Sequence, residues 1–160
     1  MLITYNDAVL RRLVRTGGVP SVNAVVDAGN LVSLRYAMPV AAFDVERIAT
    51  PVEVRFATGT ERFTDLVSDD VGLPDPGEVV FVDREGVVVA RRWCWRQSRQ
   101  SATGAATTRV LFVVEGHHEA AERDVAGALA DLTALLHAHQ PGCRATAYRL
   151  TPAGNGDGRA

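Results

Sequence analysis

The chain has 160 residues and a formal net charge of −2, and 47% of its residues are hydrophobic against 22% charged. That length fits one domain of ordinary size, and the hydrophobic content excludes disorder for the body of the chain. The near-neutral charge argues against a protein that coats nucleic acid non-specifically. All 17 basic residues are arginine, a bias that a GC-rich genome produces and that also suits an anion site.

The cysteines and the apolar runs exclude several further classes. Cys94 and Cys143 have no paired spacing, so the sequence predicts neither a disulfide framework nor a zinc site, and no metal or cofactor is expected. The N-terminus lacks the apolar core of a signal peptide, and no apolar run approaches the roughly 18–20 residues that a membrane span needs. We therefore expect a monomeric cytoplasmic protein without membrane contact.

Two helices are predicted first, followed by a set of strands, a third helix and a last strand. A first helix starts at Asn6 and ends at Gly17-Gly18, and a second runs from Pro20 to about Leu34. The predicted later elements are a turn at 44–47, strands at 52–58, 79–82, 87–92 (continuing over 93–100), 110–114 and 144–150, and a helix at 118–139. This order predicts an α+β fold, with one domain over residues 1–150 and a disordered tail over 151–160.

Polar residues recur on one face of the second predicted helix. Asn23, Asp27 and Asn30 stand at positions i, i+4 and i+7, while valines occupy the other side. Such a set is either a structural polar network or the polar wall of a pocket, because buried donors and acceptors must find partners in the protein or in a ligand. The residues alone leave both interpretations open.

A second distinctive segment is Arg91–Arg99, which holds both tryptophans of the chain. In a strand, Trp93 and Trp95 face one side, as core residues do, while Arg92 and Arg96 face the other. The arginines at 84, 91, 92, 96, 99 and 109 make the only strongly basic region, and Asp83 and Glu85 are the only acidic residues near it in sequence. This pattern suits either a phosphate-binding edge or a set of solvated strand charges.

Glu115 directly follows the apolar run 110–114 and precedes Gly116. A carboxylate in that place is either the first loop residue or a functional group held on a rigid element. No hydrolase elbow, Walker-type loop or Gly-x-Gly-x-x-Gly pattern occurs in the chain.

Five segments, in order and spacing, resemble the B3/B4 domain, the tRNA-binding editing domain of the phenylalanyl-tRNA synthetase beta subunit. They are VPSVNAVVDAGNLVSLRYAMPVAAFD, VEVRFATGTERF, PGEVVFVD, RRWCWRQS and TTRVLFVVEG, and they cover about residues 19–116. The resemblance is greatest to freestanding relatives, in which Trp-x-Trp-Arg-Gln-Ser is typical. It implies a sandwich-like fold of mixed or antiparallel sheets with outer helices. It also implies hydrolysis of tRNA charged with the wrong amino acid, chiefly tyrosine.

The family's motifs can be matched to single positions of this chain. The Asn-x-x-x-Asp-x-x-Asn segment matches Asn23, Asp27 and Asn30, and the glutamate of the family's amino-acid pocket matches Glu115. An editing-site histidine of the synthetase is replaced here by Ala41, a change that puts transfer of the tyrosine specificity in doubt.

The resemblance implies a trans-editing aminoacyl-tRNA deacylase whose partners are the aminoacylated 3′ end of tRNA and its amino acid. The expected substrate-binding residues are Asn23, Asp27, Asn30, Ala41, Arg96, Ser98 and Glu115; the RNA-binding residues are Arg84, Arg91, Arg92 and Arg99; and the catalytic candidates are Glu115, Thr107 and Thr108. Two alternatives stay open. One is a non-catalytic module that binds tRNA or an amino acid, and the other is a remnant that pairs with a partner chain through an exposed apolar patch.

Overall fold

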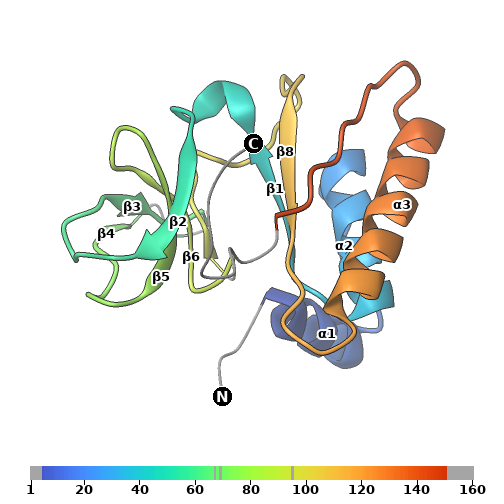
Figure 1. The fold of residues 1–160 in the computed structure, drawn as a ribbon, viewed down its shortest axis with the longest axis horizontal. Helices are drawn as coiled ribbons and strands as arrows, with labels where there is room; N and C mark the ends of the chain where they lie inside the picture. Colours follow the sequence, from blue (N-terminus) through green and yellow to red (C-terminus); the bar gives the residue numbers. More distant parts are fainter. Residues whose placement is uncertain (1–4, 67, 69, 95, 151–160) are drawn as a thin grey trace, which may run out of the picture.

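The computed structural model describes residues 5–66, 68, 70–94 and 96–150; the predicted tail at 151–160 lies outside them. A two-stranded ribbon stands between helices on one side and a four-stranded sheet on the other (Figure 1). The helices are α1 (Tyr5–Thr16), α2 (Ala24–Tyr36) and α3 (Ala121–His139); the ribbon is β1 (Val40–Asp44) with β8 (Val110–Val114); and the sheet has the order β2 (Val52–Phe56), β5 (Val79–Asp83), β6 (Val88–Arg91), β7 (Arg96–Gln97). The turn η1 (Val45–Arg47) follows β1, and β3 (Phe63–Thr64) pairs with β4 (Val71–Gly72). Every pairing between these strands is antiparallel, and the α+β prediction is confirmed.

All five residues of β1 are buried, because each face of this strand packs against a different layer. Val40 packs with Val32 and Leu132 in the apolar cluster beneath the helices. Ala41 and Phe43 point the other way and pack against the four-stranded sheet. β1 therefore joins the two halves of the domain, while its partner β8 is only partly buried.

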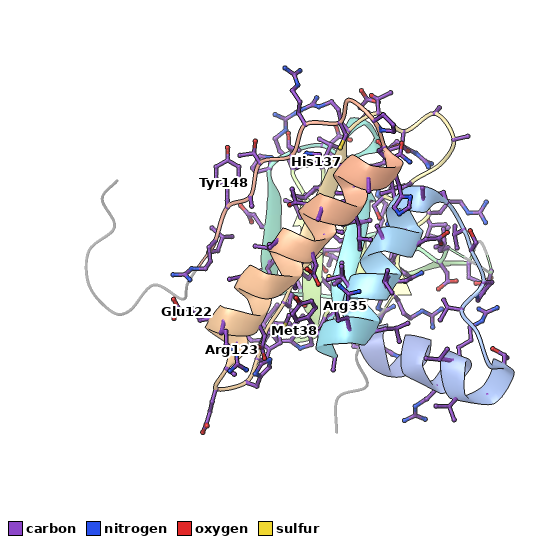
Figure 2. The ribbon with its side chains drawn as sticks, turned by 90° about the vertical axis from the view of Figure 1, so that its right-hand side faces the viewer. Arg35, Met38, Glu122, Arg123, His137 and Tyr148 are labelled. Carbon is purple, nitrogen blue, oxygen red and sulfur yellow. The ribbon has the colours of Figure 1, made fainter. Side chains whose placement is uncertain are left out.

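α2 begins and ends with local signals that fix where β1 starts. The Asn23 side chain caps the helix by accepting a hydrogen bond from the backbone N–H of Val26 at 2.9 Å. At the other end, Ala37 takes a left-handed conformation with φ 51° and turns the chain into β1. α2 lies beside α3 (Figure 2), where Tyr36 and Arg35 both donate hydrogen bonds to Asp131.

The predicted continuation of a strand over residues 93–100 is wrong, because the chain reverses there. Arg92, Trp93 and Cys94 have positive φ values of 53°, 53° and 61°, and β7 then pairs back on β6 with Ala90 opposite Gln97. Residues 92–94 therefore lack the strand on which the predicted alternation of tryptophans and arginines depends, and Trp95 lies outside the described residues. No glycine or proline marks this turn in the sequence, and the surrounding structure must hold it, since each such residue costs roughly 1–2 kcal/mol.

The predicted last strand over residues 144–150 is also wrong. This segment forms no strand and runs back along α3, where Arg149 donates a hydrogen bond to Glu122 at 2.7 Å (Figure 2). Its apolar side chains stay in solvent, with Tyr148 82% and Leu150 93% exposed. Alternation of apolar residues makes a strand only where a neighbouring strand and a buried face exist, and this segment has neither.

We predict that Phe43→Ala destabilises the domain by about 3–5 kcal/mol, because Phe43 is fully buried between the ribbon and the sheet. Urea denaturation followed by circular dichroism measures the change. Val71→Ala is the control, since Val71 is 74% exposed on β4 and its truncation should change stability by less than about 0.5 kcal/mol. Equal losses in the two variants would contradict this account of the core.

Candidate functional site

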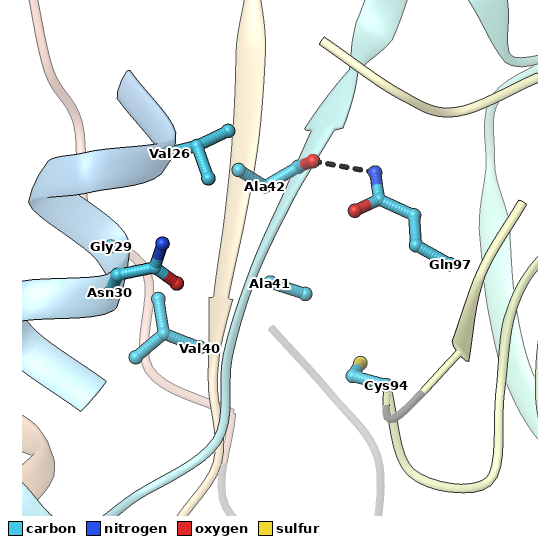
Figure 3. A pocket seen from close by; sticks show the side chains of 8 residues that line it. All are labelled: Val26, Gly29, Asn30, Val40, Ala41, Ala42, Cys94 and Gln97. Atoms are coloured by element: carbon cyan, nitrogen blue, oxygen red, sulfur yellow. Dashed lines mark hydrogen bonds between the residues drawn. The ribbon is translucent and has the colours of Figure 1, made fainter. Parts of the chain in front are cut away.

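A small cavity lies along the outer edge of β1, between α2 and the turn that follows β6 (Figure 3). Asn30 reaches from α2 toward β1, and Cys94 and Gln97 face it from the opposite side (Figure 3). The lining residues are Val26, Gly29, Asn30, Val40, Ala41, Ala42, Cys94 and Gln97. The volume is about 30 Å³, which is room for roughly one or two water molecules.

Gln97 fixes the sheet side of this cavity to the edge of β1. Its Nε2 donates hydrogen bonds to the backbone oxygens of Ala42 at 2.8 Å and Ser101 at 3.0 Å. The backbone N–H of Asp44 donates to the same Ser101 oxygen at 2.9 Å. β1 has no strand along this edge among the described residues, so these bonds satisfy backbone groups that a strand would otherwise pair.

The loop 101–109 closes the upper end of this edge. Asp44 is buried, and its Oδ2 accepts a hydrogen bond from the Thr107 hydroxyl at 2.6 Å. On the helix side, the Asn23 amide donates to the Thr103 hydroxyl at 3.3 Å. Residues 19–44, which form the first segment of the family resemblance, therefore meet the loop 101–109 along β1.

Glu115 lies just past β8, where its backbone N–H donates to the Pro39 oxygen at 3.1 Å. Strand alternation places its side chain on the sheet side of the ribbon with Val113, close enough for its charge to act on Cys94. Its Oε2 is buried and has no hydrogen-bond partner among the described residues. Burial raises the pKa of Glu115 to about 7.

Two neighbours complete the surroundings of Glu115. Cys94 is buried, and both burial and the Glu115 carboxylate raise the pKa of its thiol, so it is an inert wall of the cavity and not a nucleophile. The rings of Trp93 and His117 meet edge to face at 4.8 Å, which ties the strained turn to the chain just beyond Glu115. Cys94 and Gln97 were not foreseen as site residues, because the turn that brings them here has no sequence signal.

Several predicted substrate-binding and catalytic residues have structural partners instead of facing the cavity. Asp27 accepts hydrogen bonds from the Ser21 hydroxyl at 2.5 Å and the Val22 N–H at 2.9 Å, and so secures the chain before α2. Ser98 is fully buried and bonded to Ser101, and Thr108 donates to Glu46 in an exposed position.

The arginines near this turn are opposed by carboxylates from distant parts of the sequence. Arg91 donates to Glu78 at 2.7 and 2.5 Å and lies over the Phe63 ring, while Arg96 pairs with Asp65. Arg92 is 4.0 Å from Glu78. Asp83 and Glu85 are the acidic residues near this region in sequence, and the fold adds Glu78 and Asp65.

The remaining predicted arginines lie at the surface. Arg99 donates to the Leu66 oxygen at 3.3 Å, and Arg84 is exposed in the turn between β5 and β6. Within the described ranges, no group of three or more His, Cys, Asp or Glu side chains is placed to hold a metal ion. None of the helices in these ranges is long and apolar enough to cross a bilayer.

Fold and cavity together define an α+β domain with a partly buried carboxyl group at the end of a central ribbon. The chain belongs to the B3/4 domain family, whose model matches residues 4–135.

Related sequences and a related structure agree with this family. The phenylalanine–tRNA ligase beta subunit of Anaeromyxobacter dehalogenans is 39% identical over 104 residues, 64% of this chain and 12% of that protein. The subunit from Shewanella oneidensis is 27% identical over 81 residues, 51% of this chain and 10% of that protein. The chain thus spans about a tenth of the length of these relatives. An N-terminal fragment of the Pyrococcus horikoshii phenylalanyl-tRNA synthetase beta subunit has the same fold, with a TM-score of 0.53, 17% identity, and coverage of 68% of this chain and 40% of that one.

We predict that Thr107→Val destabilises the domain by about 1–3 kcal/mol, because it leaves a buried Asp44 oxygen without its partner. Thr108→Val is the matched control, since the Thr108 hydroxyl bonds Glu46 in an exposed position. Urea denaturation of both variants measures the difference. A loss for Thr108→Val as large as that for Thr107→Val would show that the Asp44 bond does not hold the loop.

We predict that Glu115→Gln stabilises the protein at pH 8 and has little effect at pH 5. The folded-state pKa of Glu115 is raised to about 7, so the folded protein holds a proton that the unfolded chain has released, and stability falls as the pH rises from about 4.5 to 7. The gain at pH 8 should be on the order of 2 kcal/mol after allowance for partial exposure. Stability curves against pH measure it, and Glu119→Gln, at an exposed position, should leave them unchanged.

Proposed function

We propose that this chain is an aminoacyl-tRNA deacylase that acts in trans on tRNA charged with the wrong amino acid. Membership of the B3/4 family supports a role connected with tRNA. The observation that carries the proposal is the half-buried Glu115 carboxyl, whose Oε2 is buried without a hydrogen-bond partner among the described residues and whose charge acts on Cys94, a residue that lines the cavity. A buried polar group of this kind is stabilised when a ligand supplies the missing partner.

In this proposal Glu115 binds the α-ammonium group of the aminoacyl end. A cation beside the carboxyl group favours its ionised form, so binding lowers the pKa of Glu115 and forms a charge-assisted pair. Asn30 lines the opposite side of the cavity, and the short side chain of Ala41 lines it at the position of the family's histidine. Glu115 and Asn30 would thereby orient the substrate.

The reaction needs little more than a correctly positioned water and ester carbonyl, because an aminoacyl ester is already activated. A bound water adds its oxygen to the carbonyl carbon, the bond to the terminal ribose oxygen breaks, and that oxygen takes the proton. Backbone N–H groups of the loop 101–109 would stabilise the carbonyl oxygen. The hydroxyls of Thr107 and Thr108 are less suited to this role, since they already donate to Asp44 and Glu46. The neighbouring ribose hydroxyl of the tRNA can help to orient the water.

Substrate entry requires movement, since about 30 Å³ is too small for most aminoacyl groups. The turn at residues 92–94 forms one wall and stores backbone strain, so it is the element that we expect to shift. The tRNA backbone would follow Arg84, Arg91, Arg92 and Arg99. Of these, Arg91 must keep or exchange its pairing with Glu78.

A non-catalytic binding module is the second candidate. Ala41 favours it, because the position that carries a histidine in the editing site offers no acid or base here. The same pocket would then bind a free amino acid or an aminoacyl end without cleaving the ester.

We predict that the protein deacylates at least one member of a panel of mischarged tRNAs, and that Glu115→Ala reduces the rate to that of buffer. Glu119→Ala, an exposed neighbour, is the control and should keep the full rate. Rates are followed by release of labelled amino acid. An absence of deacylation across the panel, together with calorimetric binding of an amino acid, would favour the binding module and reject the deacylase.

A further inference from the structure

β2 forms one edge of the four-stranded sheet and carries large apolar side chains into solvent. Val54 is 55% and Phe56 71% exposed, although Val52 on the same face packs against the core beneath the sheet. No other strand of the described chain pairs with the outer edge of β2. An exposed apolar edge strand is a template for pairing with another strand.

The outer edge of β2 presents the backbone groups of every second residue. The Ala57 N–H donates to the Glu78 oxygen, and the register places Arg55 opposite Val80 and Glu53 opposite Val82. Hydrogen-bonded pairs recur every two residues in an antiparallel ladder. The backbone N–H and C=O groups of residues 53, 55 and 57 therefore form hydrogen bonds with β5. The N–H and C=O groups of residues 52, 54 and 56 consequently point outward. The Phe56 oxygen already accepts a hydrogen bond from the Arg55 guanidinium at 3.0 Å, and its second lone pair is left for a bond to another strand.

We propose that two copies of this chain associate through β2, antiparallel and related by a two-fold axis at Val54. In this register Val54 faces Val54 of the second copy, and Val52 faces Phe56, so all three outward-pointing residues exchange hydrogen bonds. The four-stranded sheet then continues across the axis into the sheet of the second copy. The exposed side chains of Val54 and Phe56 become covered on the face where Val52 already packs.

The charges on β2 select this register and this partner. Arg55 pairs with the buried Glu61 of its own copy at 2.5 Å, and its guanidinium has further donors. With the axis at Val54, Glu53 of each copy lies opposite Arg55 of the other, in the closely spaced type of cross-strand pair. Sliding one strand by two residues in either direction places Glu53 opposite Glu53, or Arg55 opposite Arg55, and like charges directly opposite one another are destabilising. Strand Val52–Phe56 is thus complementary to an antiparallel copy of itself.

The interface leaves the candidate site open. β2 and β7 are opposite edges of the sheet, and the cavity lies beside β7 and β1. Each copy would keep its own site, and the proposed dimer differs from the monomer that the sequence predicts. Val54 and Phe56 form an exposed apolar patch on this strand, as association with a second chain requires.

Sedimentation equilibrium of the full chain, from low micromolar to several hundred micromolar, tests the proposal. We expect a monomer–dimer equilibrium for the wild type and a monomer for Val54→Pro, which removes an outward N–H that bonds nothing within its own sheet. Glu53→Arg should weaken association at least tenfold by placing arginines opposite each other. Glu85→Arg makes the same charge change in the exposed β5–β6 turn and should not weaken it. A wild type that stays monomeric, or a dimer that Val54→Pro leaves intact, overturns the proposal.

Crosslinking tests the register without requiring a loss of association. In a Cys143→Ser background, Val54→Cys places two thiols opposite each other on the axis, at a Cα separation of about 5.5 Å that a disulfide can span. We expect a covalent dimer under mild oxidation. Val71→Cys is equally accessible on β4 and should remain monomeric. Equal crosslinking of the two variants, or none for Val54→Cys, contradicts a two-fold axis at Val54.

Discussion

β1 is buried on both faces and pairs with a strand along only one of its edges, and the organisation of the domain follows from this constraint. Its outer N–H and C=O groups lie in the interior, where an unpaired backbone group costs about as much as a lost hydrogen bond. Gln97 and Ser101 supply the missing partners. The segment after β6 must therefore fold back against β1, and that requirement holds the unusual turn at residues 92–94 in place.

The same constraint creates the cavity. A third strand along β1 would fill the space between α2 and the sheet, whereas side-chain and loop partners leave part of it open. Glu115 enters this region because it follows β8, the strand that pairs with the other edge of β1. Burying its carboxyl group destabilises the fold at neutral pH. A destabilising buried group of this kind is kept most often where it has a function.

Electrostatic pairing across long sequence separations limits what the arginines near the turn can do. Glu78 and Asp65 neutralise Arg91 and Arg96, so the basic character that the linear sequence suggests is reduced in the folded domain. Arg84 and Arg99 lie at the surface. The surface that the arginines near the turn form is thus less basic than the linear sequence suggests.

Local patterns in the sequence determined the three helices, the hairpin across residues 83–86 and the α+β class. Caps, helical spacing and turn residues act within a few positions of one another, as Asn23 does for α2 and Gly86, with φ 76°, does for the hairpin. The resemblance of five segments also identified the family. Of the candidate site, Asn30, Ala41 and Glu115 could be named in this way.

Only the tertiary structure decided where the chain reverses after β6, that residues 144–150 form no strand, and which carboxylates pair with the arginines. It also decided that Asp27 and Ser98 serve the framework, and that Cys94 and Gln97 line the cavity. The physical reason is the same in each case. These features depend on burial and hydrogen bonds between residues far apart in the sequence, such as Gln97 with Ala42, and no local propensity contains that information.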